Sequence, residues 1–153
     1  MLQNANTILI IDQDEEDCQF FREALAEVAP GIEVICLDGE EALWADPESV
    51  RPFLIFAAYR SSGTGSIEWV EQLANHPVYG SVPVVLWSTG CLEPCQKAAY
   101  GAGVRMYMEK PWEMELWNDR VRSVLAQFPR LSSGFKKVDL SCRASRVPAL
   151  QVA

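Results

Sequence analysis

The sequence predicts an α/β protein with a doubly wound parallel sheet, on two observations. Five short apolar runs alternate with five segments whose apolar residues recur at helical spacing. The first, third and fourth runs are almost continuously apolar, which is typical of strands covered by helices on both faces. Strands and helices that alternate in this way give a parallel sheet with helices on each side.

Local signals place each element in chain order. Residues 7–12 form a first strand, and the acidic run from Asp14 to Asp17 starts a helix that ends at Pro30 and Gly31. A second strand spans residues 32–36, and Asp38 is expected to cap a helix that runs to residue 45. The other expected strands cover residues 53–58, 82–87 and 104–108, and the other expected helices cover residues 67–76, 93–101 and 111–128.

Length and composition indicate one domain. The 153 residues, of which 49% are hydrophobic, are enough for one sizeable core. The longest apolar runs are too short to cross a bilayer, and the N-terminus shows no secretion signal, so we expect no membrane contact and a cytoplasmic protein. We expect a domain over residues 1–128 and a basic, flexible tail over residues 129–153, or a short docking segment through Val147 and Leu150.

The charge distribution argues against a nucleic-acid partner. The net charge is -8, but residues 130–153 carry five basic side chains and one acidic one. The rest of the chain therefore has a net charge of -12 and repels phosphate backbones.

The five cysteines predict reduced thiols, because their number is odd and no secretion signal is present. Cys91 and Cys95 are four positions apart, but there is no second pair and His76 is the single histidine. A structural zinc site is therefore not expected. The lone histidine, expected in an exposed loop, also gives no Ser-His-Asp set, so we do not expect an enzyme.

Motifs at the ends of the predicted strands resemble the receiver domain of two-component response regulators, from residue 7 to about residue 128. Four features carry the resemblance: the Ile-Leu-Ile-Ile-Asp run ending at Asp12, the strand that ends at Ser88, the Gly101-Ala102-Gly103 break before Tyr107, and the pair Lys110-Pro111. The resemblance implies a flavodoxin-like (βα)5 fold with a five-stranded parallel sheet in the order 2-1-3-4-5.

The same resemblance implies that the family's phosphorylation chemistry is missing. Receivers use an acidic pair after the first strand and a phosphorylated aspartate after the third. Here Asp12 keeps the first acid, Gln13 replaces the second and Ala58 occupies the acceptor position. No Asp or Glu lies between Glu48 and Glu68, so shifting the third strand supplies no acceptor.

Other parts of the family pattern are kept. Ser88 matches the hydroxyl residue and Tyr107 the aromatic residue that switch position on phosphorylation. Lys110 matches the lysine that pairs with the phosphorylated aspartate. We expect Lys110 to pair with Asp12 directly or through water, with Arg60 at the rim of the pocket.

Asp12 alone is a weak metal site, so we expect no cofactor and weak or absent Mg²⁺ binding. The acidic run from Asp14 to Asp17 is interpreted as a solvated helix start, with Asp14 at its first position.

The remaining pattern predicts a phosphorylation-independent protein-interaction module. Its partner would be a sensor histidine kinase, another response regulator or an effector, and a homodimer is an alternative. The family's usual contact face would present Tyr100, Met106, Met108, Trp112 and Trp117, unless half of them fill the core.

A second hypothesis is a small-ligand or anion sensor that uses the former phosphorylation crevice. The Ser- and Gly-rich residues 61–66 suit an anion-binding turn, and Arg60 and Lys110 add positive charge. The alternative interpretation of residues 61–66 is a flexible loop.

Overall fold

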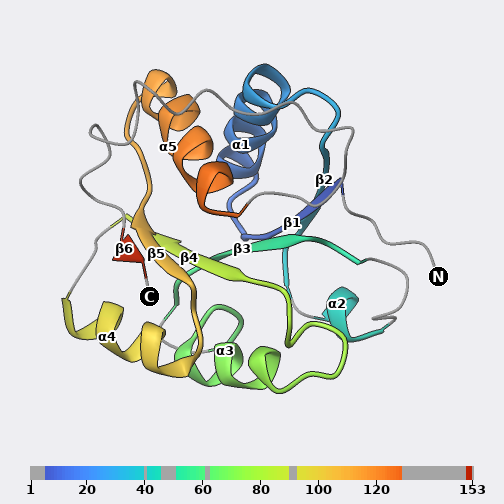
Figure 1. Cartoon of the computed structure of the whole chain (residues 1–153), viewed down its shortest axis with the longest axis vertical. Coiled ribbons are helices and arrows are strands. Elements are labelled where there is room, and N and C mark those ends of the chain that lie inside the picture. The colour runs from blue at the N-terminus through green and yellow to red at the C-terminus, as the bar shows by residue number, and fades with distance from the viewer. Residues whose placement is uncertain are drawn as a thin grey trace.

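The computed structural model describes residues 6–39, 41–45, 51–60, 63–89, 93–128 and 151–152. A six-stranded sheet runs through the middle of the molecule in the order β2-β1-β3-β4-β5-β6 (Figure 1). The strands are β1 (Thr7–Ile11), β2 (Glu33–Leu37), β3 (Leu54–Ala58), β4 (Val84–Ser88), β5 (Met106–Glu109) and β6 (Gln151–Val152). The first five are parallel, which confirms the predicted order 2-1-3-4-5.

The sequence did not predict β6, which pairs antiparallel with β5. Gln151 lies opposite Tyr107, and Val152 lies opposite Met106. This short strand covers part of the outer edge of β5, which would otherwise present unpaired backbone groups. Residues 129–150, which carry most of the predicted tail, lie outside the described residues.

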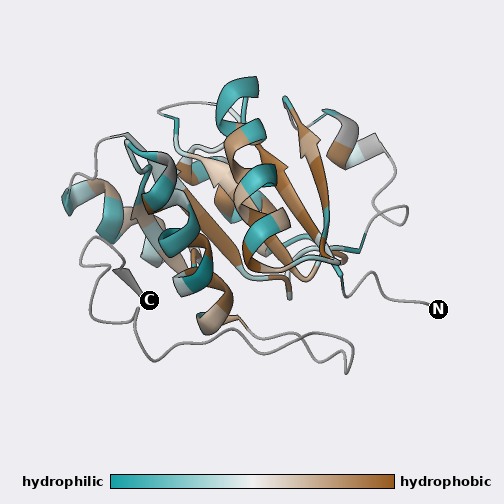
Figure 2. Cartoon of the chain, turned by 90° about the horizontal axis from the view of Figure 1, so that it is seen from above, coloured by the Kyte–Doolittle hydropathy of each residue, from teal (hydrophilic) through white to brown (hydrophobic). Residues whose placement is uncertain are grey.

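Helices cover both faces of the sheet (Figure 1). One face carries α1 (Glu15–Val28) and α5 (Met114–Gln127), and the other carries α2 (Glu41–Ala45), α3 (Ile67–Ala74) and α4 (Glu93–Ala102). The strands are hydrophobic, whereas the helices are hydrophilic on their outer sides (Figure 2). This distribution is what a sheet buried between two helical layers requires.

Successive strand residues pack into two separate cores, one on each face. In β1, Ile8 and Ile10 face the layer of α1 and α5, and Leu9 and Ile11 face the layer of α3. The first core is aromatic: the ring centroids of Phe21 and Phe56 are 4.4 Å apart, and those of Trp87 and Trp117 are 5.0 Å apart. These edge-on aromatic contacts fix α1 and α5 against the sheet.

Two helix starts differ from the prediction. The helix expected from Asp38 begins at Glu41, so Asp38 is not its first residue. The last helix begins at Met114 instead of Pro111, because the Glu113 carbonyl accepts the first helical hydrogen bonds, from Leu116 and Trp117. The shift at α5 reflects backbone hydrogen bonding, which apolar spacing does not report.

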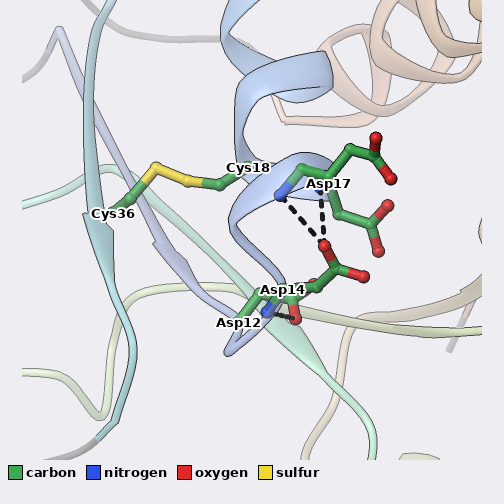
Figure 3. The surroundings of a disulfide bond; sticks show 6 residues. Asp12, Asp14, Asp17, Cys18 and Cys36 are labelled. Atoms are coloured by element: carbon green, nitrogen blue, oxygen red, sulfur yellow. Dashed lines mark hydrogen bonds between the residues drawn. A yellow bond between two sulfur atoms is a disulfide. The ribbon is translucent and has the colours of Figure 1, made fainter.

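The prediction of reduced thiols was wrong for one pair. Cys18 in the first turn of α1 forms a disulfide with Cys36 in β2, 18 positions further along (Figure 3). The crossover from β1 through α1 to β2 brings these elements side by side, and residue counting cannot show this. Cys95 is a free thiol, and Cys91 and Cys142 lie outside the described residues.

Within the part of the chain that the structure describes, no helix is both long and apolar enough to cross a membrane.

Candidate functional site

The carboxyl ends of the central strands surround a cavity of about 250 Å³. Its lining includes five of the six predicted pocket residues: Asp12, Gln13, Ala58, Arg60 and Lys110. They meet because parallel strands all deliver their carboxyl ends to one edge of the sheet. The exposed side chain of Arg60 agrees with the expected position at the rim.

Lys110 lies between two carboxylates. Its Nζ donates to Asp12 Oδ2 at 2.9 Å and to Asp17 Oδ2 at 2.6 Å. The Asp12 side chain is 5% exposed and that of Lys110 is 12% exposed, so water screens the pairs only weakly. The predicted direct pairing of Asp12 with Lys110 is thus present.

These contacts keep the Lys110 ammonium charged. Burial lowers the pKa of Lys110, but hydrogen bonds to Asp17 and Asp12 and their negative charges raise it, and the net pKa lies above its usual value of 10.5. The ammonium also lies 5.7 Å from the ring centroid of Trp87, a second favourable contact for a cation.

The acidic residues around Lys110 are occupied by hydrogen bonds. Asp12 Oδ1 accepts the backbone N–H of Asp14, and Asp14 Oδ1 accepts the N–H groups of Glu16 and Asp17 (Figure 3). Asp14 is therefore the N-cap of α1, as expected. The cap fixes the first turn of α1 and holds Asp17 over Lys110.

The donor set does not suit a divalent cation. Mg²⁺ and Mn²⁺ need several oxygen ligands, usually carboxylates. Ala58 offers no side-chain oxygen, Gln13 is neutral and exposed, and both Asp12 oxygens already accept hydrogen bonds. Among the described residues, no group of three or more His, Cys, Asp and Glu side chains could hold a metal ion.

The loop after β3 closes tightly on Ala58. Gly65 has a φ of +90°, and a Cβ at this position would lie 2.0 Å from the carbonyl oxygen of Ala58. Gly65 is buried, its carbonyl accepts the N–H of Arg60 at 3.3 Å, and Ser66 caps α3 through the N–H of Trp69. Residues 63–66 thus form hydrogen-bonded turns that lead into α3, and Ser61 and Ser62 of the expected flexible loop lie outside the described residues.

The two predicted switch residues are in contact. The Tyr107 side chain is fully buried, and its hydroxyl lies 3.2 Å from Ser88 Oγ. The Tyr107 N–H donates to the Tyr100 hydroxyl at 3.0 Å, which ties β5 to α4.

Tyr59 follows β3, and its hydrogen bond with the Cys95 thiol, together with burial, raises the pKa of Tyr59 to about 12.

Several solved structures that share this architecture are response regulators. The phosphorylated cyanobacterial phytochrome response regulator RcpA matches with a TM-score of 0.70 at 21% identity, covering 80% of this chain and 93% of that one. The Mn²⁺-bound form of response regulator Rcp1 gives 0.68 at 20% identity, covering 83% and 97%. A two-component response regulator from Clostridium difficile gives 0.64 at 26% identity, covering 78% and 95%.

The fold is that of a response-regulator receiver domain. No protein-family model matches the chain, and no curated protein sequence matches it either. The likeness therefore rests on the arrangement of the strands and helices, at sequence identities of 20% to 26% with these three proteins.

The predicted contact face of the receiver is only partly exposed. Met106, Met108 and Trp117 are at most 2% exposed and belong to the core, so placing them on the surface was wrong. They are buried because β5 carries helices on both faces and Trp117 points from α5 toward Trp87. Tyr100 is half-buried, whereas Trp112, two residues before the start of α5, is 80% exposed.

Two residues have roles that the sequence did not reveal. Asp17 pairs with Lys110 and is not merely part of a solvated helix start. The sequence signal for this role was the position of Asp17, three residues after the N-cap. Side chains in a helix tilt toward its N-terminus, so the Asp17 side chain lies toward the strand ends. His76 is half-buried instead of exposed: its ring stacks on Trp44, and its Nδ1 accepts the N–H groups of Val78 and Tyr79.

Proposed function

We propose that this chain is a receiver-like module of two-component signal transduction that acts through protein–protein contacts without being phosphorylated. The observation that carries the proposal is the pocket itself. Where a receiver needs an aspartate nucleophile, β3 ends in Ala58, and the lysine nearby is held by Asp12 and Asp17. An incoming phosphoryl group would meet no carboxylate nucleophile and a cation whose charge is already balanced.

The switch residues support a single fixed state. In receivers that switch, the hydroxyl and the aromatic residue move when the aspartate is phosphorylated. Here Tyr107 is already buried and hydrogen-bonded with Ser88, with an alanine at the acceptor position. The buried Tyr107 side chain, hydrogen-bonded with the half-buried Ser88, stabilises one arrangement, and no phosphorylated aspartate is available to favour another.

The segment that leads into α5 is the favoured docking surface. Trp112, two residues before α5, is 80% exposed, and Leu116 in the first turn of α5 is 38% exposed. Exposed aromatic side chains beside aliphatic ones are typical of interface hot spots. We infer a protein partner of the signalling pathway in the cytoplasm: a sensor histidine kinase, another response regulator or an effector, with a homodimer as an alternative.

A small phosphodonor tests the proposal. We expect no phosphoryl adduct by mass spectrometry after incubation of the wild-type chain with acetyl phosphate and Mg²⁺. The matched variants are Ala58→Asp and Gln13→Asp/Ala58→Asp, which restore the family's acids, and the double variant is expected to gain an adduct. A stoichiometric adduct on the wild-type chain contradicts the proposal.

We also propose that the pocket works without Mg²⁺. We expect no saturable change in tryptophan fluorescence on Mg²⁺ titration, because Asp12 is already bonded to Lys110 and to the backbone. A millimolar-range transition that Asp12→Ala abolishes would show that a cation site exists.

A second candidate function is a small-ligand or anion sensor. The specific observation is the cavity of about 250 Å³, whose lining includes Arg60, Thr64 and Lys110. The same cavity is also lined by three carboxylates that repel anions, which argues against the sensor: Asp12, Asp14 and Asp38. A thermal-shift screen with phosphate, nucleotides and cyclic dinucleotides separates the two functions. A shift that Arg60→Ala removes supports the sensor, and no shift supports the interaction module.

A further inference from the structure

We propose that Cys18 and Cys36 form a reversible redox site that exchanges with neutral or cationic small-molecule disulfides and sets the position of Asp17 over Lys110. The two Cα atoms are 6.6 Å apart, within the range that a disulfide spans. This inference does not depend on whether the chain is phosphorylated.

Small reagents can reach the pair. Both cysteines line a cavity of about 540 Å³ that is separate from the strand-end cavity, although Asp12 and Asp38 border both. Cys36 is half-buried and Cys18 is 7% exposed, so the bond lies where the core beside α1 meets the cavity wall. A disulfide at a cavity wall is open to attack by a thiolate.

The charge of the cavity selects the reagent. Its acidic lining residues are Asp12, Glu15 and Asp38, and its basic one is Arg22. A cleft with an excess of one sign concentrates molecules of the opposite sign and repels those of the same sign. A diamine disulfide such as cystamine should therefore react faster than glutathione disulfide, which carries several carboxylates.

The exchange conserves atoms and electrons without a metal or a further cofactor. A thiolate of one cysteine attacks the small-molecule disulfide, forms a mixed disulfide and releases one small thiolate, which takes up the proton that the cysteine lost. The second cysteine thiolate attacks the protein sulfur of the mixed disulfide. This step forms the Cys18–Cys36 bond and releases the second small thiolate with its proton. Excess small thiol drives both steps backward.

The bond acts on Lys110 through the first turn of α1. Cys18 directly follows Asp17, whose carboxylate accepts from Lys110 at 2.6 Å, and Figure 3 shows the disulfide running from this turn to β2. Further along α1, Phe21 is fully buried against Phe56 and Trp87. Reduction should therefore leave the helix and its Asp14 cap in place and remove only the restraint that the disulfide adds to the first turn, which loosens the Asp17–Lys110 pair.

The test uses the full chain with Cys91, Cys95 and Cys142 replaced by serine, so that the pair alone reacts. Oxidation by cystamine, glutathione disulfide and neutral hydroxyethyl disulfide is followed by mass spectrometry. Each rate is divided by the rate of the same reagent on the urea-unfolded chain. We expect cystamine to exceed glutathione disulfide by about tenfold at low ionic strength, with a smaller ratio in high salt.

Lysine acylation with a limiting N-hydroxysuccinimide ester measures how the disulfide affects the Asp17–Lys110 pair. Lys97 is the internal control, because its side chain is 79% exposed and its pairing with Glu93 is weak. We expect the Lys110-to-Lys97 labelling ratio to rise several-fold on reduction, and Asp17→Asn to give the same rise in the oxidised chain. Cys36→Ser should match the reduced chain.

Three results overturn the proposal. The first is a Cys18–Cys36 pair that does not exchange with small-molecule disulfides in the folded chain. The second is a Lys110-to-Lys97 labelling ratio that reduction leaves unchanged, and the third is loss of far-ultraviolet circular dichroism on reduction. The last result would make the bond a structural brace only.

Discussion

Lys110 donates a hydrogen bond to Asp17 across 93 positions of sequence, at 2.6 Å, and this contact sets the charge of the strand-end pocket. Together with the pair to Asp12, it encloses one ammonium between two carboxylates. The effects of these two pairs on the stability of the protein can be measured without knowledge of a protein partner.

Replacing Lys110 should destabilise the protein. Lys110→Met leaves Asp12 and Asp17 without their cation and should lower the free energy of unfolding by about 2 kcal/mol, because hydrogen bonds to charged groups contribute in that range. Lys97→Met is the matched control and should change it by less than about 0.5 kcal/mol, since its ion pair is fully accessible to water. Urea denaturation at neutral pH measures both, and equal effects would contradict the role of Lys110.

The contribution of Lys110 should depend on pH in one direction. Its pKa in the folded protein is raised above the usual 10.5, so the folded state holds the proton more tightly than the unfolded state. The stability difference between wild type and Lys110→Met should be complete below 10.5 and should shrink as the pH rises through the folded-state pKa. Urea denaturation across the alkaline range checks this, and a difference that grows with alkalinity would reverse the sign.

Gly65 should tolerate no side chain. Gly65→Ala places a Cβ against the Ala58 carbonyl and should cost about 3 kcal/mol, from overpacking together with the left-handed backbone. Gly63→Ala has a φ of +77° with open space around it, so it should cost only about 1 kcal/mol. Thermal denaturation compares the two, and similar costs would mean that the contact with Ala58 can relax.

Trp112 should be the tryptophan most accessible to solvent. It is 80% exposed, whereas Trp69, Trp87 and Trp117 are at most 2% exposed. Trp112→Ala should remove most acrylamide-quenchable fluorescence and change the free energy of unfolding by less than about 0.5 kcal/mol.

The same variant tests the docking surface. If the wild-type chain self-associates through the segment that leads into α5, sedimentation velocity at high concentration should show the association disappear in Trp112→Ala. A wild-type monomer at all concentrations removes the homodimer alternative and leaves a different protein as the partner.

Much of the fold could be predicted because periodicity and strand ends are local properties. The apolar runs predicted five strands, and the resemblance to receivers implied their order in the sheet. Asp14 and Ser66 cap helices through contacts no more than three residues away. The pairing of Asp12 with Lys110 was also predictable, since parallel strands bring their carboxyl ends together whatever lies between them.

Other features depended on which helix lies beside which strand. The Cys18–Cys36 bond and the second carboxylate at Asp17 both arise where the first turn of α1 meets the sheet. The burial of Met106, Met108 and Trp117 likewise follows from helices that cover β5 on both faces.

The sequence by itself determined the five parallel strands, their order along the chain and the absence of Asp and Glu between Glu48 and Glu68, because these are properties of residue type and spacing along the chain. Only the tertiary structure decided that Lys110 has two acidic partners, that two cysteines are joined and that Trp112 is exposed. Those contacts depend on distances between segments far apart in the sequence, and such distances are fixed only when the two helical layers pack onto the sheet.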